Sequence, residues 1–202
     1  MWPSGGGDDV KVVLAVSGAS GAIFGAEMLR ALVCHQVDVD LICSPVADEV
    51  AEQELGEGIG CRVARVLRET GSSAQVRSLD YDDFAAPPSS GSYRHQGMLI
   101  VPCSMATVGR IASGAAPNLI CRAADVCLKE RRPLVLGVRE TPLSTIHLRN
   151  LLSLSEAGAI IAPAAPSFYG QPETILEMVR TYCGRMLDAL GIENDWAFRW
   201  GS

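Results

Sequence analysis

Five short, mostly apolar runs in this sequence each end in small or polar residues. The runs cover residues 10–16, 37–43, 98–101, 134–138 and 159–162. Segments with the apolar spacing of helices follow most of them, and repeated strand-then-helix units indicate a parallel sheet with right-handed crossovers. Ligands of an open parallel sheet bind just beyond the carboxyl ends of its strands. The sequence therefore predicts an α/β protein whose polar strand ends form one site.

Chain length and composition fit a single domain. The 202 residues are 48% hydrophobic, which is enough for a sizeable core, and no repeat or linker interrupts them. The net charge of −6 argues against a nucleic-acid partner, and no run approaches the roughly 20 apolar residues of a membrane span. Residues 1–9 are Gly-rich and acidic and lack the apolar core of a signal peptide. We therefore expect a flexible leader before a domain over residues 10–202.

The seven cysteines indicate a reducing compartment. Their number is odd and no C-x-x-C pair occurs, so buried free thiols in the cytoplasm are the simplest interpretation. The three histidines show no ligand spacing with the cysteines or with one another, and we predict no metal site. Cys103 adjoins the expected site, so a catalytic thiol stays an open alternative, although no histidine obviously pairs with it.

Helical periodicity is clear in most of the chain and weak in its middle. Between residues 56 and 97, residues 61–67 and 74–76 are candidate strands, and residues 85–92 form a loop rich in Pro and Ser. The expected helices cover residues 22–33, a stretch that begins near Ser44, and residues 104–113, 118–130, 143–157 and 172–190, with Asn118 as an N-cap.

Two strand-to-helix junctions carry groups that suit an anion. At the first, Ser17-Gly18-Ala19-Ser20-Gly21, glycines allow a tight turn and the helix start offers free N–H groups. The spacing is neither the dinucleotide G-x-G-x-x-G nor a P-loop, which favours a mononucleotide phosphate; a tight turn that binds nothing is the alternative. At the second, Ser104 and Thr107 lie one helical turn apart. Ser104 is either an N-cap alone or an N-cap that also binds a ligand.

Glu54 stands out among the carboxylates. On the helix that begins near Ser44 it falls in the middle of an apolar arc, whereas the other acidic residues before it face the opposite side. A carboxylate on a buried face must be paired, have a raised pKa, or both, and either state suits a proton-transfer group. Fraying of the helix, which would let Glu54 reach water, is the alternative.

Two sets of charged residues are ambiguous by pattern. Arg122 and Lys129 share a helix face on which Asp125 could pair with both, as in an ordinary surface ladder. Arg139 and Glu140 directly follow an expected strand. There the arginine suits an oxyanion and the glutamate can orient it or move a proton, with a solvated loop pair as the alternative.

The C-terminal part carries aromatic residues outside any clear core. Trp196 and Trp200 lie in a tail, residues 191–202, that we expect to pack on the site or on a neighbouring chain. Arg185 follows Tyr182 by about one turn in the last expected helix, and by pattern alone it is a surface residue.

Many segments, in the same order, resemble the UbiX family of flavin prenyltransferases over roughly residues 10–200. The matching segments are residues 17–22 (SGASGA), 86–92, 102–104, 118–126 (NLICRAADV), 128–136 (LKERRPLVL), 139–142 (RETP), 146–148, 163–169 and 171–172. There are departures. Ser17 stands where the family often has Thr, Met105 and Ala106 where Thr-Gly is common, and Phe84 where Trp is frequent. The flavin and prenyl pockets are therefore expected to differ somewhat in shape.

The resemblance implies a Rossmann-like, flavodoxin-like flavoprotein with three layers around a doubly wound parallel sheet, in a single domain. Members of the family attach a dimethylallyl group to N5 and C6 of reduced FMN, and UbiD-type decarboxylases use the product as a cofactor. They typically form dodecamers whose sites are shared between subunits, and they need no metal. The implied donor is dimethylallyl phosphate, with the diphosphate left open.

The resemblance also implies roles for individual residues. The expected FMN contacts are Gly18, Ala19, Ser20, Ser44, Ser104, Met105, Ala106, Thr107, Arg122 and Arg139. The expected contacts of the prenyl phosphate are Ser90, Lys129, Arg139, Tyr169 and Arg185, with Trp200 near the prenyl tail. Glu54 and Glu140 are the expected acid–base pair, and Lys129 and Ser20 are expected to assist catalysis. The resemblance thus replaces the pattern-based interpretation of Arg185 and agrees with that of Glu54.

Other activities fit the sequence less well. A flavin-dependent cysteine decarboxylase of related fold would use a histidine beside the flavin, and His35 and His95 are poorly placed for it. An FMN carrier without turnover would not need the full set of charged residues named above. A decarboxylase that acts on an aromatic acid would need a further acid-binding group, for which the sequence offers no candidate.

Overall fold

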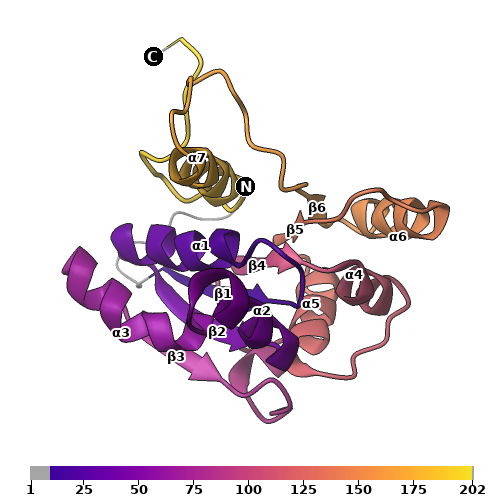
Figure 1. Ribbon diagram of the computed structural model, residues 1–202. Helices are drawn as coiled ribbons and strands as arrows, with labels where there is room; N and C mark the ends of the chain where they lie inside the picture. Colours follow the sequence, from indigo (N-terminus) through magenta and orange to yellow (C-terminus); the bar gives the residue numbers. More distant parts are fainter. Residues whose placement is uncertain (1–9, 202) are drawn as a thin grey trace.

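A computed structural model describes residues 10–201 of the chain. Its centre is one sheet of parallel strands in the order β3-β2-β1-β4-β5-β6 (Figure 1). The strands are β1 (Lys11–Val16), β2 (Asp38–Cys43), β3 (Val76–Leu79), β4 (Gly97–Cys103), β5 (Leu134–Val138) and β6 (Ile160–Ile161). Strand order reverses between β1 and β4, and ligands of doubly wound sheets bind beside such a reversal. The predicted doubly wound α/β fold is confirmed.

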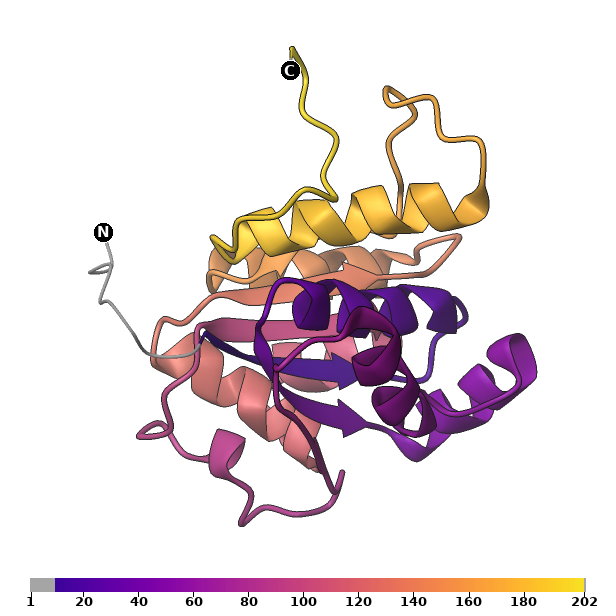
Figure 2. The same cartoon turned by 90° about the vertical axis from the view of Figure 1, so that its left-hand side faces the viewer.

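Helices cover both faces of the sheet (Figures 1 and 2). One face carries α1 (Ala22–Cys34), α2 (Pro45–Leu55), α3 (Ile59–Thr70) and α7 (Ile175–Ala189), and the other carries α4 (Met105–Ala112), α5 (Leu119–Lys129) and α6 (Thr145–Glu156). Because both faces are covered, the central strands are buried throughout: Val12, Val13 and Leu14 have no exposed surface. This burial explains why the strands read as continuous apolar runs.

The middle of the chain differs from its prediction. Residues 61–67, predicted as a strand, lie inside α3, where Ile59 and Val66 are buried and Arg68 is exposed. Buried positions seven residues apart share one face of a helix but lie on opposite faces of a strand. The strand expected at residues 74–76 is β3, which begins two residues later and pairs with β2. A short 3-10 helix, η1 (Pro87–Ser89), lies within the expected loop.

Side-chain caps set where several helices begin. Asn118 accepts a hydrogen bond from the amide of Cys121, at 3.0 Å, which confirms it as the N-cap of α5. Thr174 caps α7 in the same way, so the last helix begins at Ile175 and not at residue 172. The residues before it extend from the fold as a loop.

Residues 163–174 and 197–201 project away from the sheet beside α7, and we call them the C-terminal arm (Figures 1 and 2). The tail is anchored on α7 by Asn194, whose side-chain amide donates to the carbonyl of Gly184 at 3.1 Å. Asn194 also accepts from the amide of Ala197 at 3.0 Å. Beyond this anchor, Trp200 is 81% exposed. The tail therefore packs on α7 through Asn194 and again through Arg199, whose guanidinium pairs with Asp188 at 2.8 Å, and it leaves its last tryptophan accessible.

The predicted leader of residues 1–9 lies outside the described residues. Within residues 10–201, no helix is long and apolar enough to cross a membrane. All seven cysteines are free thiols, and four of them are buried.

Candidate active site

A cavity of about 360 Å³, here called the central cavity, opens at the carboxyl ends of β1, β2 and β4. Three strand-to-helix turns and the segments around β3 and α5 form it. Its lining comprises Ser17, Gly18, Ser44, Pro45, Val46, Tyr81, Ser104, Ala106, Thr107, Arg110, Asn118 and Ile120. The turns come from strands on both sides of the reversal in strand order, so the cavity lies where this fold is expected to bind a ligand.

Ser17 joins two of these turns. Its buried hydroxyl donates to the carbonyl of Pro102 at 3.1 Å and accepts from the amide of Ser104 at 2.8 Å. The backbone amide of Ser17 donates to the same carbonyl at 3.2 Å. These hydrogen bonds fix the distance between the turn after β1 and the turn after β4.

Replacement of Ser17 by alanine should destabilise the chain and loosen the cavity. The substitution leaves the Ser104 amide without a partner in a partly buried place, which costs up to about 1–3 kcal/mol. Urea unfolding measures this cost, and the affinity for FMN should fall in the same variant. Ser17→Thr keeps the hydroxyl and should restore both. Equal stability of Ser17→Ala and the unsubstituted chain would contradict the bridging role.

Two helices begin at the central cavity with hydroxyl caps. Ser44 accepts from the amide of Ala47 at 3.1 Å, and Ser104 accepts from the amide of Thr107 at 3.3 Å. The Ser104 and Thr107 hydroxyls also lie 3.1 Å apart. The N-terminal ends of α2 and α4 carry partial positive charge, so cap hydroxyls and helix ends together suit an anion. Ser104 is an N-cap that also lines the cavity, and its binding of a ligand stays a prediction.

Glu54 is exposed, and the prediction that it lies on a buried face is wrong. The apolar arc of α2 is buried only through its small residues Ala47 and Ala51, while Val46 is 52% exposed. The end of α2 passes over the start of α1 and not onto the sheet. Of the two states predicted for Glu54, pairing is present, because its carboxylate accepts hydrogen bonds from the turn after β1, whereas a raised pKa is wrong.

Backbone amides hold this carboxylate. Glu54 accepts from the amide of Ala22 at 2.7 Å and from that of Gly21 at 2.9 Å. Partial burial acts to raise the pKa of this carboxyl. The hydrogen bonds from the Ser20 hydroxyl and the two amides, together with the charge of Arg139, outweigh burial and lower the pKa below its ordinary value. Glu54 is therefore ionised at neutral pH.

Arg139 follows the end of β5 and lies beside the same turn. A methyl group built on Gly21 would lie 3.7 Å from Cγ of Arg139. Its Nε is buried and has no hydrogen-bond partner among the described residues. Leaving such a donor unsatisfied costs about 1–3 kcal/mol or more, so the arginine is suited to a bound anion such as phosphate. Glu140 is exposed and accepts from the amide of Thr141 at 3.0 Å.

Ser90, Arg122 and Lys129 form a second group, on α5 and the loop around η1. Arg122 donates through Nε to the carbonyl of Ser89 at 3.1 Å and pairs with Asp125 at 2.8 Å. Lys129 pairs with Glu130 and not with Asp125. Of the surface ladder that the sequence pattern allowed, only the pair of Arg122 and Asp125 is therefore present. Arg122, an expected FMN contact, lies in this group and does not line the central cavity.

Several bonds hold the loop of this second group in place. Arg132 donates to the carbonyls of Gly91 and Tyr93. The Tyr93 hydroxyl donates to the buried carboxylate of Asp40 at 2.6 Å. A methyl group at Gly91 would lie 2.8 Å from Nζ of Lys129. The loop thus holds Ser90, one residue before Gly91, close to Lys129.

Tyr169 and Trp200 of the C-terminal arm form a third group with Arg185 of α7. They line a cavity of about 590 Å³ together with Ser167 and Phe198. The rings of Tyr169 and Trp200 meet edge to face with centroids 5.1 Å apart. Arg185 pairs with Asp188 at 2.7 Å. A cation beside an open aromatic surface suits a ligand with an anionic head and a short apolar tail.

One chain does not bring the three groups together. Helix α5 runs opposite to the strands, so its last residue, Lys129, lies toward their amino ends. Glu54 and Ser104 lie at the carboxyl ends. No hydrogen bond or ion pair within residues 10–201 joins Lys129 or Arg185 to either of them.

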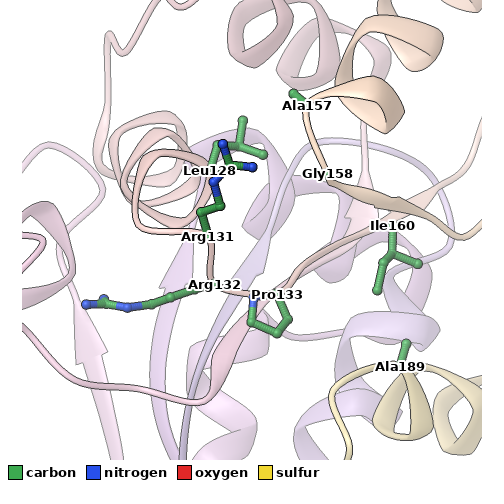
Figure 3. A pocket seen from close by; sticks show the side chains of 8 residues that line it. All are labelled: Leu128, Arg131, Arg132, Pro133, Ala157, Gly158, Ile160 and Ala189. Carbon is green, nitrogen blue, oxygen red and sulfur yellow. The ribbon is translucent and has the colours of Figure 1, made fainter. Parts of the chain in front are cut away.

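A further cavity, of about 340 Å³, lies at the amino end of β5 beside Pro133 (Figure 3). Arg131 runs toward Leu128, and Arg132 turns away from Pro133 (Figure 3). The nitrogens of Arg132 are already used by the loop carbonyls of the second group. This cavity contains none of the predicted site residues and is not part of the site.

The alternative of a catalytic thiol at Cys103 is not supported. The side chain is buried, and burial raises the pKa of the thiol far above its ordinary value. A thiol that stays protonated is a weak nucleophile. Among the described residues, no group of three or more His, Cys, Asp or Glu side chains is arranged to hold a metal ion.

Sequence reasoning did not identify Tyr81 and Arg110 as parts of the central cavity. Arg110 follows Thr107 by three residues on α4, a spacing that places both on one helix face. From this spacing, the sequence could have indicated that Arg110 lies beside Thr107 in the site. Tyr81 lies in the stretch with the weakest pattern and gave none.

Known proteins identify the family. The Flavoprotein family model matches residues 4–187. The flavin prenyltransferase UbiX of Pseudomonas aeruginosa is 44% identical over 196 residues, which cover 95% of this chain and 94% of that protein. The chain belongs to the UbiX family of flavin prenyltransferases. The UbiX protein of Methanothermobacter thermautotrophicus is likewise 44% identical and covers 94% of each chain.

Solved structures of the UbiX family agree with this fold. AnUbiX (PadA1), in complex with FMN and dimethylallyl pyrophosphate, is 40% identical with a TM-score of 0.88, over 96% of this chain and 99% of that one. A dodecameric FMN-dependent UbiX-like decarboxylase from Escherichia coli O157:H7 is 40% identical with a TM-score of 0.83, over 96% and 100%. The resemblance and the flavodoxin-like fold are confirmed, and the chain is an enzyme of the prenyltransferase type. The cysteine decarboxylase TvaF, at 18% identity and a TM-score of 0.55, shares the fold alone.

Proposed function

We propose that this UbiX-family chain transfers a dimethylallyl group from dimethylallyl phosphate to N5 and C6 of reduced FMN. The observation that supports this most is that Arg139 and Glu54 both lie at the turn after β1. Arg139 has a buried nitrogen without a partner among the described residues, and the carboxylate of Glu54 is held at the same turn by the amides of Gly21 and Ala22. The transfer needs a cation for the departing phosphate and a base for a proton, and this pair supplies both.

The reaction balances without an oxidant or a metal. The bond between the allyl carbon and the phosphate oxygen breaks, and phosphate leaves with the bonding electrons. N5 and C6 of the flavin each gain a bond to carbon. Each also gives up one proton, while one proton is added to the alkene. The flavin therefore gains one C5H8 unit.

The residues of the chain have separate tasks in this proposal. The hydroxyls of Ser44, Ser104 and Thr107 hold the polar end of the flavin in the central cavity. Glu54 accepts a proton near the reacting edge, and Arg139 stabilises the negative charge that accumulates on the departing phosphate. Glu140, the exposed residue that directly follows Arg139, serves as the second proton-transfer group.

We propose that a complete site takes the second and third groups from neighbouring chains. The three groups lie apart on one chain, and a UbiX-like relative at 40% identity is dodecameric. On this basis Ser90, Lys129, Tyr169, Arg185 and Trp200 of neighbours hold the donor. Arg122 would reach the flavin from a neighbour. We further propose that the chain works in the cytoplasm, where its cysteines stay reduced, and that its product passes to a UbiD-type decarboxylase.

Mass spectrometry of the released flavin tests the transfer. The purified protein is incubated anaerobically with dithionite-reduced FMN and dimethylallyl phosphate, and in parallel with the diphosphate. We expect a gain of one C5H8 unit with the monophosphate, absent without protein. A gain with the diphosphate alone would change the donor. Bound but unchanged FMN with both donors would contradict the transferase function and favour a flavin carrier, and oxidation of a cysteine-containing peptide would favour the thiol-oxidising alternative.

A further inference from the structure

Arg110 is the charged side chain of the central cavity. Among the described residues that line this cavity, no other carries a positive charge and none carries a carboxylate. Arg110 is exposed, so its guanidinium is accessible to a ligand in the cavity. A cation in a cavity without a carboxylate attracts an anion.

The position of Arg110 on α4 aligns it with the other anion-binding groups. It follows Thr107 by three residues and Ala106 by four, and residues at these spacings share a helix face. Thr107 in turn contacts Ser104, the cap of α4. The cap hydroxyls, the helix end and the guanidinium therefore border one space.

The guanidinium is not engaged elsewhere. No hydrogen bond or ion pair among residues 10–201 uses a side-chain nitrogen of Arg110. Its charge lies close enough to Tyr81 to offset part of the rise in the tyrosine's pKa that burial causes. Tyr81 also lines the cavity, so the guanidinium lies at that end of it.

We propose that Arg110 binds the terminal phosphate of the flavin in the central cavity and makes the chain prefer FMN to riboflavin. This inference rests on the proposed function, in which the cavity holds FMN. It divides the two phosphates of the reaction between two arginines: Arg110 takes the phosphate that stays on the flavin, and Arg139 takes the phosphate that leaves the donor. Arg139 has an unpartnered nitrogen at the turn that binds Glu54, whereas no hydrogen bond or ion pair among the described residues joins Arg110 to that carboxylate.

Flavin binding, measured by quenching of flavin fluorescence, tests this inference without turnover. FMN and riboflavin are titrated into the unsubstituted chain and into Arg110→Ala, Arg110→Lys and Arg68→Ala. We expect Arg110→Ala to weaken FMN binding about 10-fold to 100-fold, as for loss of a charge-assisted hydrogen bond, and to leave riboflavin binding within about twofold. Arg110→Lys should recover part of the loss, mostly at low salt. Arg68→Ala removes the same charge from an exposed position on α3 and should change neither affinity.

Three results would overturn the inference. Unchanged FMN affinity in Arg110→Ala would show that the guanidinium does not contact the phosphate. Equal weakening of FMN and riboflavin would indicate general damage to the cavity. A raised KM for dimethylallyl phosphate with unchanged FMN affinity would assign Arg110 to the donor. If the unsubstituted chain prefers FMN through Arg110 but does not prenylate it, the inference stands and the proposed function fails.

Discussion

Replacement of Glu54 by glutamine should reduce prenyl transfer about 100-fold to 10,000-fold, as expected for loss of a proton-transfer group. FMN affinity should change less than about tenfold, because the glutamine oxygen can still accept from the amides of Gly21 and Ala22. Single-turnover measurement of flavin alkylation under anaerobic conditions gives the rate, and fluorescence titration gives the affinity. Glu52→Gln, an exposed change on the same helix, is the matched control. Full turnover by Glu54→Gln would end the catalytic assignment.

The stability of Glu54→Gln relative to the unsubstituted chain should depend on pH. The folded-state pKa of Glu54 is lowered, so its carboxylate contributes stability that is fully present above the ordinary pKa of a glutamic acid. This contribution is lost as the pH falls through the lowered pKa. The difference in unfolding free energy between the chain and Glu54→Gln should therefore be constant near neutrality and shrink below that ordinary pKa. A difference that grows on acidification would contradict the lowered pKa.

Two inactive variants should restore activity to each other when they assemble together. If sites are shared, Glu54 and Lys129 of one site belong to different chains. Random co-assembly of equal amounts of Glu54→Gln and Lys129→Ala then leaves about one quarter of the sites with both residues intact, since each position is native in half of the chains. Co-expression with two different affinity tags, followed by the prenylation assay, measures the regained activity.

The double variant is the control for this experiment. A chain that carries both substitutions should be inactive. The two single variants should also stay inactive when they are mixed after each has assembled separately, so that no subunits exchange. Activity no higher than the mean of the two single variants would place both residues of a site on one chain.

The sequence was sufficient for the sheet because its strands are buried on both faces and read as apolar runs. It failed at residues 61–67, where short apolar spacing fits either a strand or a helix with a narrow buried face. Glu54 shows a second limit. Helical periodicity placed it on a buried face, which is wrong, because periodicity does not say what a face packs against, and the end of α2 meets the start of α1.

The arginines show what depends on tertiary structure. Arg139 was recognisable because it directly follows a strand, and strand ends meet at one edge of a parallel sheet. Arg110 was not recognised, because its role depends on how close α4 lies to Tyr81 and to the cap of α2. Lys129 and Arg185 carry charge by sequence, yet their separation from Glu54 on one chain follows only from the direction of α5 and the position of α7.

The hydroxyl of Ser17 bonds to partners 85 and 87 positions away along the chain, and this separation has a consequence for biosynthesis. The flavin site cannot exist on a nascent chain until β4 has been made and has paired with β1. Closure of so long a segment is slow compared with local helix formation. A flavin that binds only the finished fold raises its stability in proportion to the logarithm of flavin concentration. Newly made chains should therefore resist degradation for longer where flavin is abundant.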